Sequence, residues 1–343
     1  MENKIVILTD YKNNFGSKWN NIPYRSGMDK TLLGKYFKEL GYDIEIVKFS
    51  EFNALKYTQD CFIIYTSSED IDYIYKDYIE DVVLYAQESG LNVIPAYKFL
   101  RANNNKAFME LIKKSIFSKE FNNLETNVYG TFDEATLKKI KYPIVLKESS
   151  GAMSTGVFLA KNQSEFVVLA KKISETKSFN NDIKDALRPL KHKGYIKESL
   201  YRKKFVTQEF IPNLQSDYKV LVFGEKYYVF ERPVRKGDFR ASGSGNKNYI
   251  YGSQVNLPKG ILDFVKKAFD QASIPQLSID IAYDGSKLYI IEFQALYFGT
   301  VGHVKSDGFY SLIDDNWKFC YKKLDFEQIY VESIDYHIEK YIK

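Results

Sequence analysis

The sequence predicts a mixed α/β fold, with a parallel sheet at the N-terminus and antiparallel strands after it. The first hundred residues alternate apolar strands with helices, a pattern that implies a parallel sheet. Residues 142–160 indicate a strand, a loop of small residues and a second strand. Residues 278–294 place two β-rich runs around an Asp-Gly turn, which predicts an antiparallel hairpin.

The composition is that of a globular protein and argues against several functional classes. With 343 residues, 45% of them hydrophobic, the chain is long enough for two or three domains with their own cores. The net charge of +5 does not demand nucleic acid as a partner, although it suits an anionic small ligand. The two cysteines form no CxxC or Cys/His cluster, so neither a zinc site nor a disulfide framework is indicated. We find no signal peptide and no apolar run of membrane-spanning length, and therefore expect a cytoplasmic protein without a membrane partner.

The N-terminal segment supplies the expected parallel sheet. Strands are predicted at 4–9, 43–49, 61–66 and 91–95, and helices at 28–40 and 70–89. No GxGxxG follows the first strand, so the dinucleotide-binding fingerprint is missing. The long polar loop 10–27 lies where ligands bind in parallel sheets, but we interpret it first as a plain connection.

A lysine stands in the first turns of the next helix. The stretch Asn103–Met109 opens this helix with an asparagine cap, and Lys106 follows at the positive helix end, where a cation is disfavoured. The position makes sense if an anion docks there, because helix N-termini bind phosphate. The alternative is a lysine that faces water.

The loop between the two middle strands is a candidate phosphate cradle. Lys147 ends the first strand, and the loop 149–156 is rich in Ser, Thr and Gly, so its backbone N–H groups can approach an anion closely. It is not a Walker A loop, because the next element is a strand. The HRD and DFG motifs of protein kinases are absent. By itself such a loop is weak evidence for phosphate binding.

The segment after this hairpin combines a lysine-rich stretch with further strands. Residues 180–204 lack clear periodicity, and we interpret them as an insertion or mobile segment on a lid, with a solvated charged face. Strands are expected at 205–211, 217–223 and 226–234. Arg240 then stands among small residues, where its planar fork suits a phosphate clamp. A structural ion-pair partner is the alternative.

The hairpin over 278–294 carries three oxygen-bearing side chains. Asp280 lies on its first strand, and Glu292 and Gln294 lie two apart on the second, so these two share a face. If the strand register brings Asp280 opposite them, all three converge. Carboxylates on otherwise apolar strands need a partner, and Mg²⁺ prefers such oxygen ligands. A surface hairpin with acidic residues in water is the alternative.

From about residue 100 to 300 the chain resembles the ATP-grasp superfamily, most closely its carboxylate–amine ligases of the ribosomal-protein glutamate ligase type. The segments that carry the resemblance are Pro143–Lys147 with the loop to Gly156, Gln208–Ile211 followed by Asp217, Glu231-Arg232 with Gly237–Arg240, and the trio Asp280, Glu292 and Gln294. The resemblance implies an ATP-grasp fold with an N-terminal α/β pre-ATP-grasp domain (1–101), a central subdomain with a glycine-rich lid (102–206), and a C-terminal antiparallel-sheet subdomain with the metal site and a helical tail (207–343).

The resemblance also implies roles for individual residues. Residues expected to bind ATP are Lys106, Lys147, Ser150, Gly151, Gly156, Glu209, Phe210, Ile211, Asp217 and Ser242. Of these, 209–211 would form the hinge against the adenine edge, and Asp217 would lie near the ribose. Arg240 is the expected catalytic residue at the transferred phosphate. Asp280, Glu292 and Gln294 would hold Mg²⁺, with Mn²⁺ as an alternative. The family's third ligand is usually Asn, so Gln294 puts the geometry of a second metal in doubt.

The activity implied by the resemblance is ATP-dependent ligation. Family members phosphorylate a carboxylate with ATP, and an amine then attacks the acyl phosphate, which leaves ADP and phosphate. Small-molecule or peptide substrates fit this reaction, nucleic acid does not, and a homodimer is compatible with it. Two alternatives stay open, namely an ATP-grasp phosphotransferase acting on a small molecule and a nucleotide-binding protein without turnover. His303, just after the hairpin, is either a contact or base for the acceptor or a structural residue.

Overall fold

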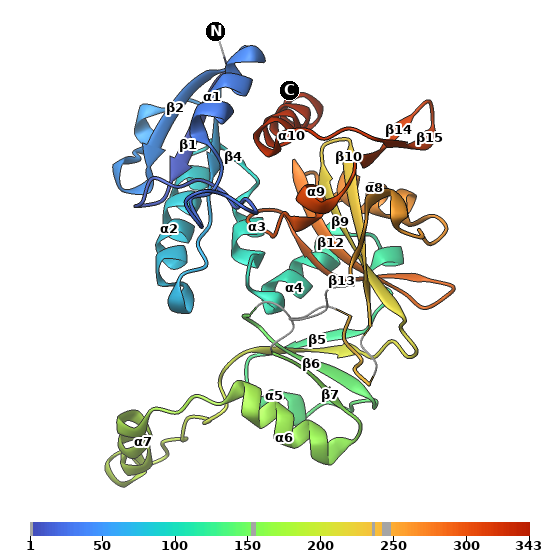
Figure 1. Cartoon of the computed structure of the whole chain (residues 1–343). Helices are drawn as coiled ribbons and strands as arrows, with labels where there is room; N and C mark the ends of the chain where they lie inside the picture. The colour runs from blue at the N-terminus through green and yellow to red at the C-terminus, as the bar shows by residue number, and fades with distance from the viewer. Residues whose placement is uncertain (1–2, 152–155, 235–236, 242–247) are drawn as a thin grey trace.

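The structure is a computed structural model that describes residues 3–151, 156–234, 237–241 and 248–343. Within these ranges the strands form an N-terminal, a middle and a C-terminal sheet (Figure 1). None of the helices in the described ranges combines the length and the apolar character that a membrane crossing requires.

The N-terminal sheet is parallel, with the strand order β2-β1-β3-β4. Its strands are β1 (Lys4–Thr9), β2 (Asp43–Lys48), β3 (Cys61–Tyr65) and β4 (Asn92–Ile94). The helices of this part are α1 (Lys30–Glu39), α2 (Ile74–Glu88), α3 (Tyr97–Ala102) and the short 3₁₀ turns η1 (Phe49–Glu51), η2 (Ala54–Lys56) and η3 (Ile71–Tyr73). The Asp29 side chain caps α1 by accepting from two backbone N–H groups of its first turn. The predicted parallel sheet is confirmed.

The middle sheet is antiparallel, with the order β5-β8-β6-β7. Its strands are β5 (Thr126–Tyr129), β6 (Ile144–Glu148), β7 (Val157–Ala160) and β8 (Phe205–Glu209). The helices α4 (Lys106–Ile116), α5 (Phe132–Thr136), α6 (Gln163–Ser174) and α7 (Phe179–Lys191) accompany it, with the 3₁₀ turn η4 (Lys119–Phe121). Leu146, Phe166 and Phe205 lie in a buried cluster of its own. The predicted boundary between residues 206 and 207 falls inside β8, so we propose that the middle unit extends to Glu209.

The lysine-rich segment contains a helix that the sequence reasoning missed. Figure 1 shows α7 standing away from the sheet and from α5 and α6. Apolar residues recur at 179, 183, 187 and 190, a helical spacing that the intervening lysines and Pro189 obscured. The prediction of an aperiodic segment over 180–204 was therefore wrong for its first half.

The C-terminal sheet is built around β9, β10 and β12, in the order β13-β12-β9-β10-β14-β15 with β11 on β10. Its strands are β9 (Ser216–Phe223), β10 (Lys226–Pro233), β11 (Ile250–Tyr251), β12 (Gln276–Tyr283), β13 (Leu288–Gln294), β14 (Phe309–Ile313) and β15 (Asn316–Cys320). The accompanying helices are α8 (Ile261–Ala272), α9 (Val301–Lys305), α10 (Phe326–Tyr341) and the 3₁₀ turn η5 (Gly252–Gln254). The predicted hairpin over 278–294 is confirmed as the antiparallel pair β12–β13.

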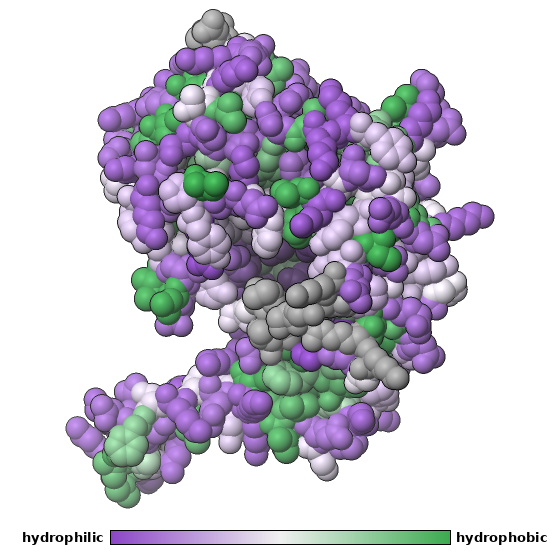
Figure 2. Space-filling model, viewed as in Figure 1, coloured by the Kyte–Doolittle hydropathy of each residue, from purple (hydrophilic) through white to green (hydrophobic). Residues whose placement is uncertain are grey.

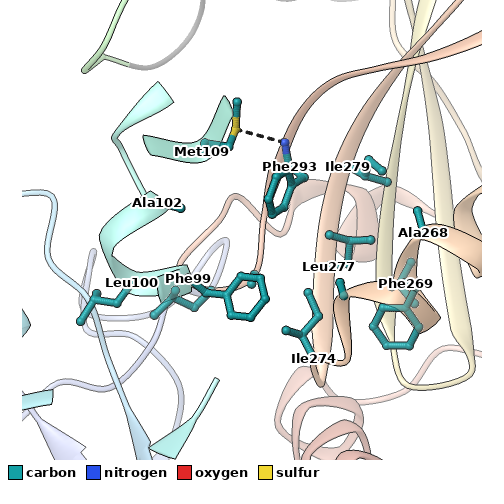
Figure 3. Close-up of a cluster of buried hydrophobic side chains, with 14 of the residues drawn as sticks. Phe99, Leu100, Ala102, Met109, Ala268, Phe269, Ile274, Leu277, Ile279 and Phe293 are labelled. Carbon is teal, nitrogen blue, oxygen red and sulfur yellow. Dashed lines mark hydrogen bonds between the residues drawn. The ribbon is translucent and has the colours of Figure 1, made fainter. Parts of the chain in front are cut away.

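The N-terminal and C-terminal sheets share one buried core. Figure 3 shows Phe99 of α3 and Met109 of α4 on one side, and Leu277 and Phe293 of the C-terminal sheet on the other. The Sδ atom of Met109 lies 3.5 Å from the backbone nitrogen of Phe293. A second tie joins α10 to the N-terminal part, where the Tyr42 hydroxyl donates to Asp335 at 2.8 Å. The middle sheet, with its separate core, therefore adjoins a larger fused body.

Candidate active site

A cavity of about 470 Å³ is lined by residues of both the middle and the C-terminal sheet. The predicted site residues that line it are Lys106, Lys147, Gly151, Glu209, Phe210, Ile211, Asp217, Arg240, Asp280, Glu292 and Gln294. Ser150 lines a neighbouring cavity instead. Gly156 lies so close to the side chain of Glu148 that a Cβ atom at this position would come within 2.8 Å of it. Ser242 lies outside the described residues. The structure thus gathers most of the predicted residues, scattered over nearly 190 positions of the chain, around one space.

The acidic hairpin has the register on which its proposed role depends. Asp280 pairs directly with Glu292 across β12 and β13, and Gln294 pairs with Ser278. A register irregularity follows Asp280. The amide nitrogen of Gln294 lies 3.4 Å from the side-chain oxygen of Asn103, which leaves the amide oxygen as the acceptor for another group. The register required for convergence is present, and all three side chains line the same cavity.

Two cations on neighbouring strands hold the carboxylate of Asp280. Lys219 of β9 lies opposite Asp280 in the sheet and contacts its Oδ1 at 2.7 Å. Arg232 of β10 lies 2.9 Å from its Oδ2 and donates through Nε to Asp217. Burial alone would raise the pKa of Asp280, but Arg232 and Lys219 outweigh it and hold that pKa well below its usual range. Burial and the neighbouring Asp280 charge raise the pKa of Asp217 to about 6, against the pull of Arg232.

Lys147 is a buried cation on the opposite wall. It is the residue before the last one of β6 and is only 5% exposed. Burial lowers the pKa of the Lys147 ammonium, while the charges of Glu110 and Glu292 act in the opposite direction. A buried ammonium without a close ion-pair partner is costly, so an anionic ligand at this wall would relieve it.

The N-terminus of α4 is tied to the start of the glycine-rich loop. Lys106 is the first residue of α4, its backbone N–H donates to the carbonyl of Ser149 at 2.7 Å, and its Nζ donates to the carbonyl of Gly151 at 2.6 Å. Asn105 is the asparagine that caps the helix, and its side-chain oxygen also accepts from the Ser149 hydroxyl at 3.1 Å. The predicted lysine in the first turn is confirmed, and these hydrogen bonds connect the helix end to the start of the loop.

Apolar residues line another part of the cavity. Val145 of β6, Val157 of β7 and Ile291 of β13 contribute side chains from three strands. Phe210 and Ile211 follow β8, where the ring of Phe210 packs edge-on against Phe239 with centroids 6.4 Å apart. Such a lining suits a flat, uncharged ring system.

Arg240 lines the cavity but is already paired. Its guanidinium contacts both carboxylate oxygens of Asp238, with Nη2 at 2.9 Å from Oδ2 and Nε at 3.1 Å from Oδ1. This hydrogen bonding raises the pKa of Arg240. The ion-pair interpretation is therefore realised in the structure, and the phosphate clamp stays a prediction that requires Arg240 to exchange Asp238 for a phosphate.

His303 lies elsewhere and is structural. Its Nε2 is 3.0 Å from the carbonyl oxygen of Leu324, and its ring packs against Tyr228 and Phe326. Burial lowers its pKa. These contacts support the structural interpretation of His303, which is not among the residues that line the cavity.

Sequence reasoning missed Lys219 and Arg232. The signal was present, because Lys219 lies two residues after Asp217 on an otherwise apolar strand, and so shares its face. What was missing is the strand order, which sets β9 between β10 and β12. Charged residues recurring on one face of apolar strands would have pointed to both cations.

The donor set of the hairpin fits a hard divalent cation. Two carboxylates and an amide oxygen are typical Mg²⁺ ligands, and Mg²⁺ usually completes its shell with water and substrate phosphates. Lys219 and Arg232 each occupy one oxygen of Asp280, but a carboxylate oxygen has a second lone pair. The described residues contain no group of three or more His, Cys, Asp or Glu that could hold a metal ion, so the hairpin would need the amide oxygen of Gln294 as its third protein ligand.

Comparison with known proteins identifies the fold. No protein-family model matches the chain, and a search of curated proteins finds no match. A solved structure described as a RimK domain protein ATP-grasp from Sphaerobacter thermophilus DSM 20745 superposes with a TM-score of 0.52 at 11% identity, covering 96% of this chain and 98% of that one. The D-cycloserine synthetase DcsG gives a TM-score of 0.53 at 9% identity, with the same coverage. The chain therefore has the ATP-grasp fold, as its motifs predicted.

Proposed function

We propose that this chain, which has the ATP-grasp fold, is an ATP-dependent ligase that joins a carboxylate to an amine through an acyl phosphate and releases ADP and phosphate. The observation that carries the proposal is a single cavity in which the cationic Lys106, Lys147 and Arg240 meet the carboxylates of Asp280 and Glu292. Cations can neutralise the phosphates of ATP, and carboxylates can hold the metal that accompanies them.

The cavity offers a place for each part of ATP. The apolar lining at Val145, Phe210, Ile211 and Ile291 suits the adenine ring, with the segment 209–211 along its edge. Lys147 and Lys106 would face the phosphates. The ribose contact predicted for Asp217 uses its Oδ2, since Arg232 engages Oδ1. Gly151 and Gly156 belong to the loop that would cover the phosphates.

The metal site is proposed at the hairpin. Asp280, Glu292 and the amide oxygen of Gln294 would hold Mg²⁺, with Mn²⁺ as an alternative. When bound, the cation supplies charge neutralisation for the phosphate oxygens. Lys219 and Arg232 serve this site by fixing the Asp280 carboxylate in place and keeping it ionised.

The chain's own residues provide positioning and electrostatic stabilisation. Once Arg240 has left Asp238, its planar fork can stabilise the charge that develops on the transferred phosphoryl group. The loop that follows Lys147, anchored to α4 through Ser149, can exclude water and so protect an acyl phosphate from hydrolysis. No nucleophilic side chain is needed for either step.

ADP release is the measurement that tests this function. The purified chain is incubated with ATP, Mg²⁺ and a panel of small-molecule and peptide carboxylates and amines. Release that requires both a carboxylate and an amine supports the ligase. Release with an alcohol acceptor alone favours the phosphotransferase, and nucleotide binding without release favours a protein without turnover.

We also propose a cytoplasmic location, which suits the two cysteines, neither of which is in a disulfide.

A further inference from the structure

The helix α7 presents an apolar stripe with nothing packed on it. None of its 13 residues is buried. Phe179 is 79% exposed and Leu190 is 85% exposed, and Ile183 and Leu187 lie between them at helical spacing. Figure 2 shows apolar surface on the projecting arm that contains α7 in Figure 1. Contiguous exposed apolar surface of this kind marks an interaction site.

The charge along one edge of this stripe is positive, and Asp182 lies on the opposite edge. Lys184 and Lys191 lie along one edge of α7, and neither forms an ion pair with a described residue. Lys177 and Lys193 flank the two ends of the helix. A partner for this face therefore needs apolar residues together with carboxylates.

The helix α2 of the same chain carries a face of that chemistry. Ile74, Tyr78 and Tyr85 are exposed and share one side of the helix with Asp77 and Asp81. These two carboxylates form no ion pair within the described part of the chain. Ile74 to Tyr85 and Phe179 to Leu190 each span eleven residue steps, so the two stripes match in length, at roughly 16 Å.

Within one chain the two stripes are poorly placed to meet along their length. The base of the arm, Arg202–Lys204, lines a cavity of about 760 Å³ together with the start of α2. The α2 residues in this cavity end at Glu80, so the arm approaches only the first turns of the helix.

We propose that α7 of one copy packs along α2 of a second copy, in a reciprocal dimer. The arrangement is self-complementary, because α7 of each copy packs on α2 of the other copy, as a two-fold axis requires. The dimer contains two α7–α2 contacts, so the surface that it buries is twice that of one contact. This matters because a stable interface buries about 1,600 Å² in total. Lys184 and Lys191 then face Asp77 and Asp81, and the apolar residues of both stripes leave water.

Sedimentation analysis of the full chain over a wide concentration range tests the dimer. The unmodified chain should dimerise, and Leu187→Asp on α7 or Tyr78→Asp on α2 should each weaken dimerisation about tenfold or more. Leu55→Asp is the control, since Leu55 is also an exposed apolar residue but lies on neither stripe. A chain that stays monomeric at all concentrations, or a dimer that these variants leave intact, overturns the proposal.

Charge reversal and cross-linking identify the two partners. Lys184→Glu with Lys191→Glu should weaken the dimer, and Asp77→Lys with Asp81→Lys should do the same. An equimolar mixture of these two proteins should restore the dimer, because both contacts of the mixed pair then join opposite charges. A mixture of Leu190→Cys and Tyr78→Cys chains should form a disulfide between chains under mild oxidation. A double variant that closes only within one chain would overturn the dimer in favour of a closing arm. A monomer that binds anionic vesicles through Leu187 would overturn it in favour of a membrane surface.

Discussion

Lys219 and Asp280 lie directly opposite each other on β9 and β12, and their side chains form an ion pair of 2.7 Å at the wall of the cavity. The carboxylate that we propose as a metal ligand is therefore built into the sheet by a cation, and Arg232 holds its other oxygen. Preorganisation of this kind keeps the ligand at a fixed position before any substrate arrives. It also means that changes at Asp280 affect stability as well as activity.

The metal assignment is tested most cleanly at Glu292. We expect Glu292→Gln to abolish ADP release while the melting temperature changes little, because the substitution removes a charged ligand without breaking an ion pair. Asp280→Asn should also abolish turnover, but it should destabilise the fold too, since breaking a buried pair costs about 3–5 kcal/mol. Near-normal rates for both variants at saturating Mg²⁺ would refute the assignment.

Variants of Gln294 test whether its amide oxygen is a metal ligand. Gln294→Asn should be tolerated, because the amide oxygen is retained. Gln294→Leu should lower activity by about 2 kcal/mol or more in transition-state terms, the usual value of one oriented electrostatic contact. The measurement is kcat/KM for ATP at several Mg²⁺ concentrations, and full activity of the leucine variant would show that Gln294 is not a ligand.

Lys147 is expected to act in ATP binding. Lys147→Ala should weaken ATP affinity by about 1.5–3 kcal/mol, the range for a hydrogen bond to a charged group. Calorimetric titration with ATP measures this directly. Lys139→Ala provides the control, since Lys139 lies exposed in the same part of the chain. Equal ATP affinity of the two variants would place the phosphates away from Lys147.

Arg240 is expected to act in the transition state rather than in binding. Arg240→Lys keeps the charge but loses the bidentate fork, so it should lower kcat by more than it raises the KM for ATP. Asp238→Asn is the companion variant, because it removes the carboxylate that pairs with Arg240 and should not lower kcat in the same way. If Arg240→Lys changes only the melting temperature, the residue is a structural partner of Asp238.

Acid stability should report the ion pairs of Asp280. Because its folded-state pKa lies below the ordinary carboxyl value of about 3.9, the pairs stabilise the fold above that pH, and this contribution is lost as the pH falls further. Lys219→Met should therefore lower the melting temperature at neutral pH and have a smaller effect in acid. Lys318→Met, which breaks only an exposed pair with Asp314, should change little at any pH. A Lys219→Met effect that does not vary with pH would contradict this origin.

Only part of the hairpin's arrangement followed from local pattern. Alternation along β13 put Glu292 and Gln294 on one face. The pairing next to the Asp-Gly turn, Ile281 with Ile290, would set Asp280 opposite Ile291, and the register irregularity after Asp280 is what brings it opposite Glu292. Lys147 at the end of its strand and Lys106 at a helix start were equally readable, because strand ends and helix caps are encoded by neighbouring residues.

Tertiary structure decided what surrounds those residues. The cations that hold Asp280 come from β9 and β10, some fifty to sixty positions earlier, and only the order β12-β9-β10 makes them neighbours. Arg240 was predicted to lie near the phosphates, but its pairing with Asp238, two residues earlier, depends on the backbone conformation of this short segment. The sequence by itself determined the fold class and the chemistry of the site, because periodicity and motif spacing are local. The ion pairs, the burial of Lys147 and the exposed stripe of α7 were decided by strand order and packing, because these bring distant residues together or leave them without a neighbour.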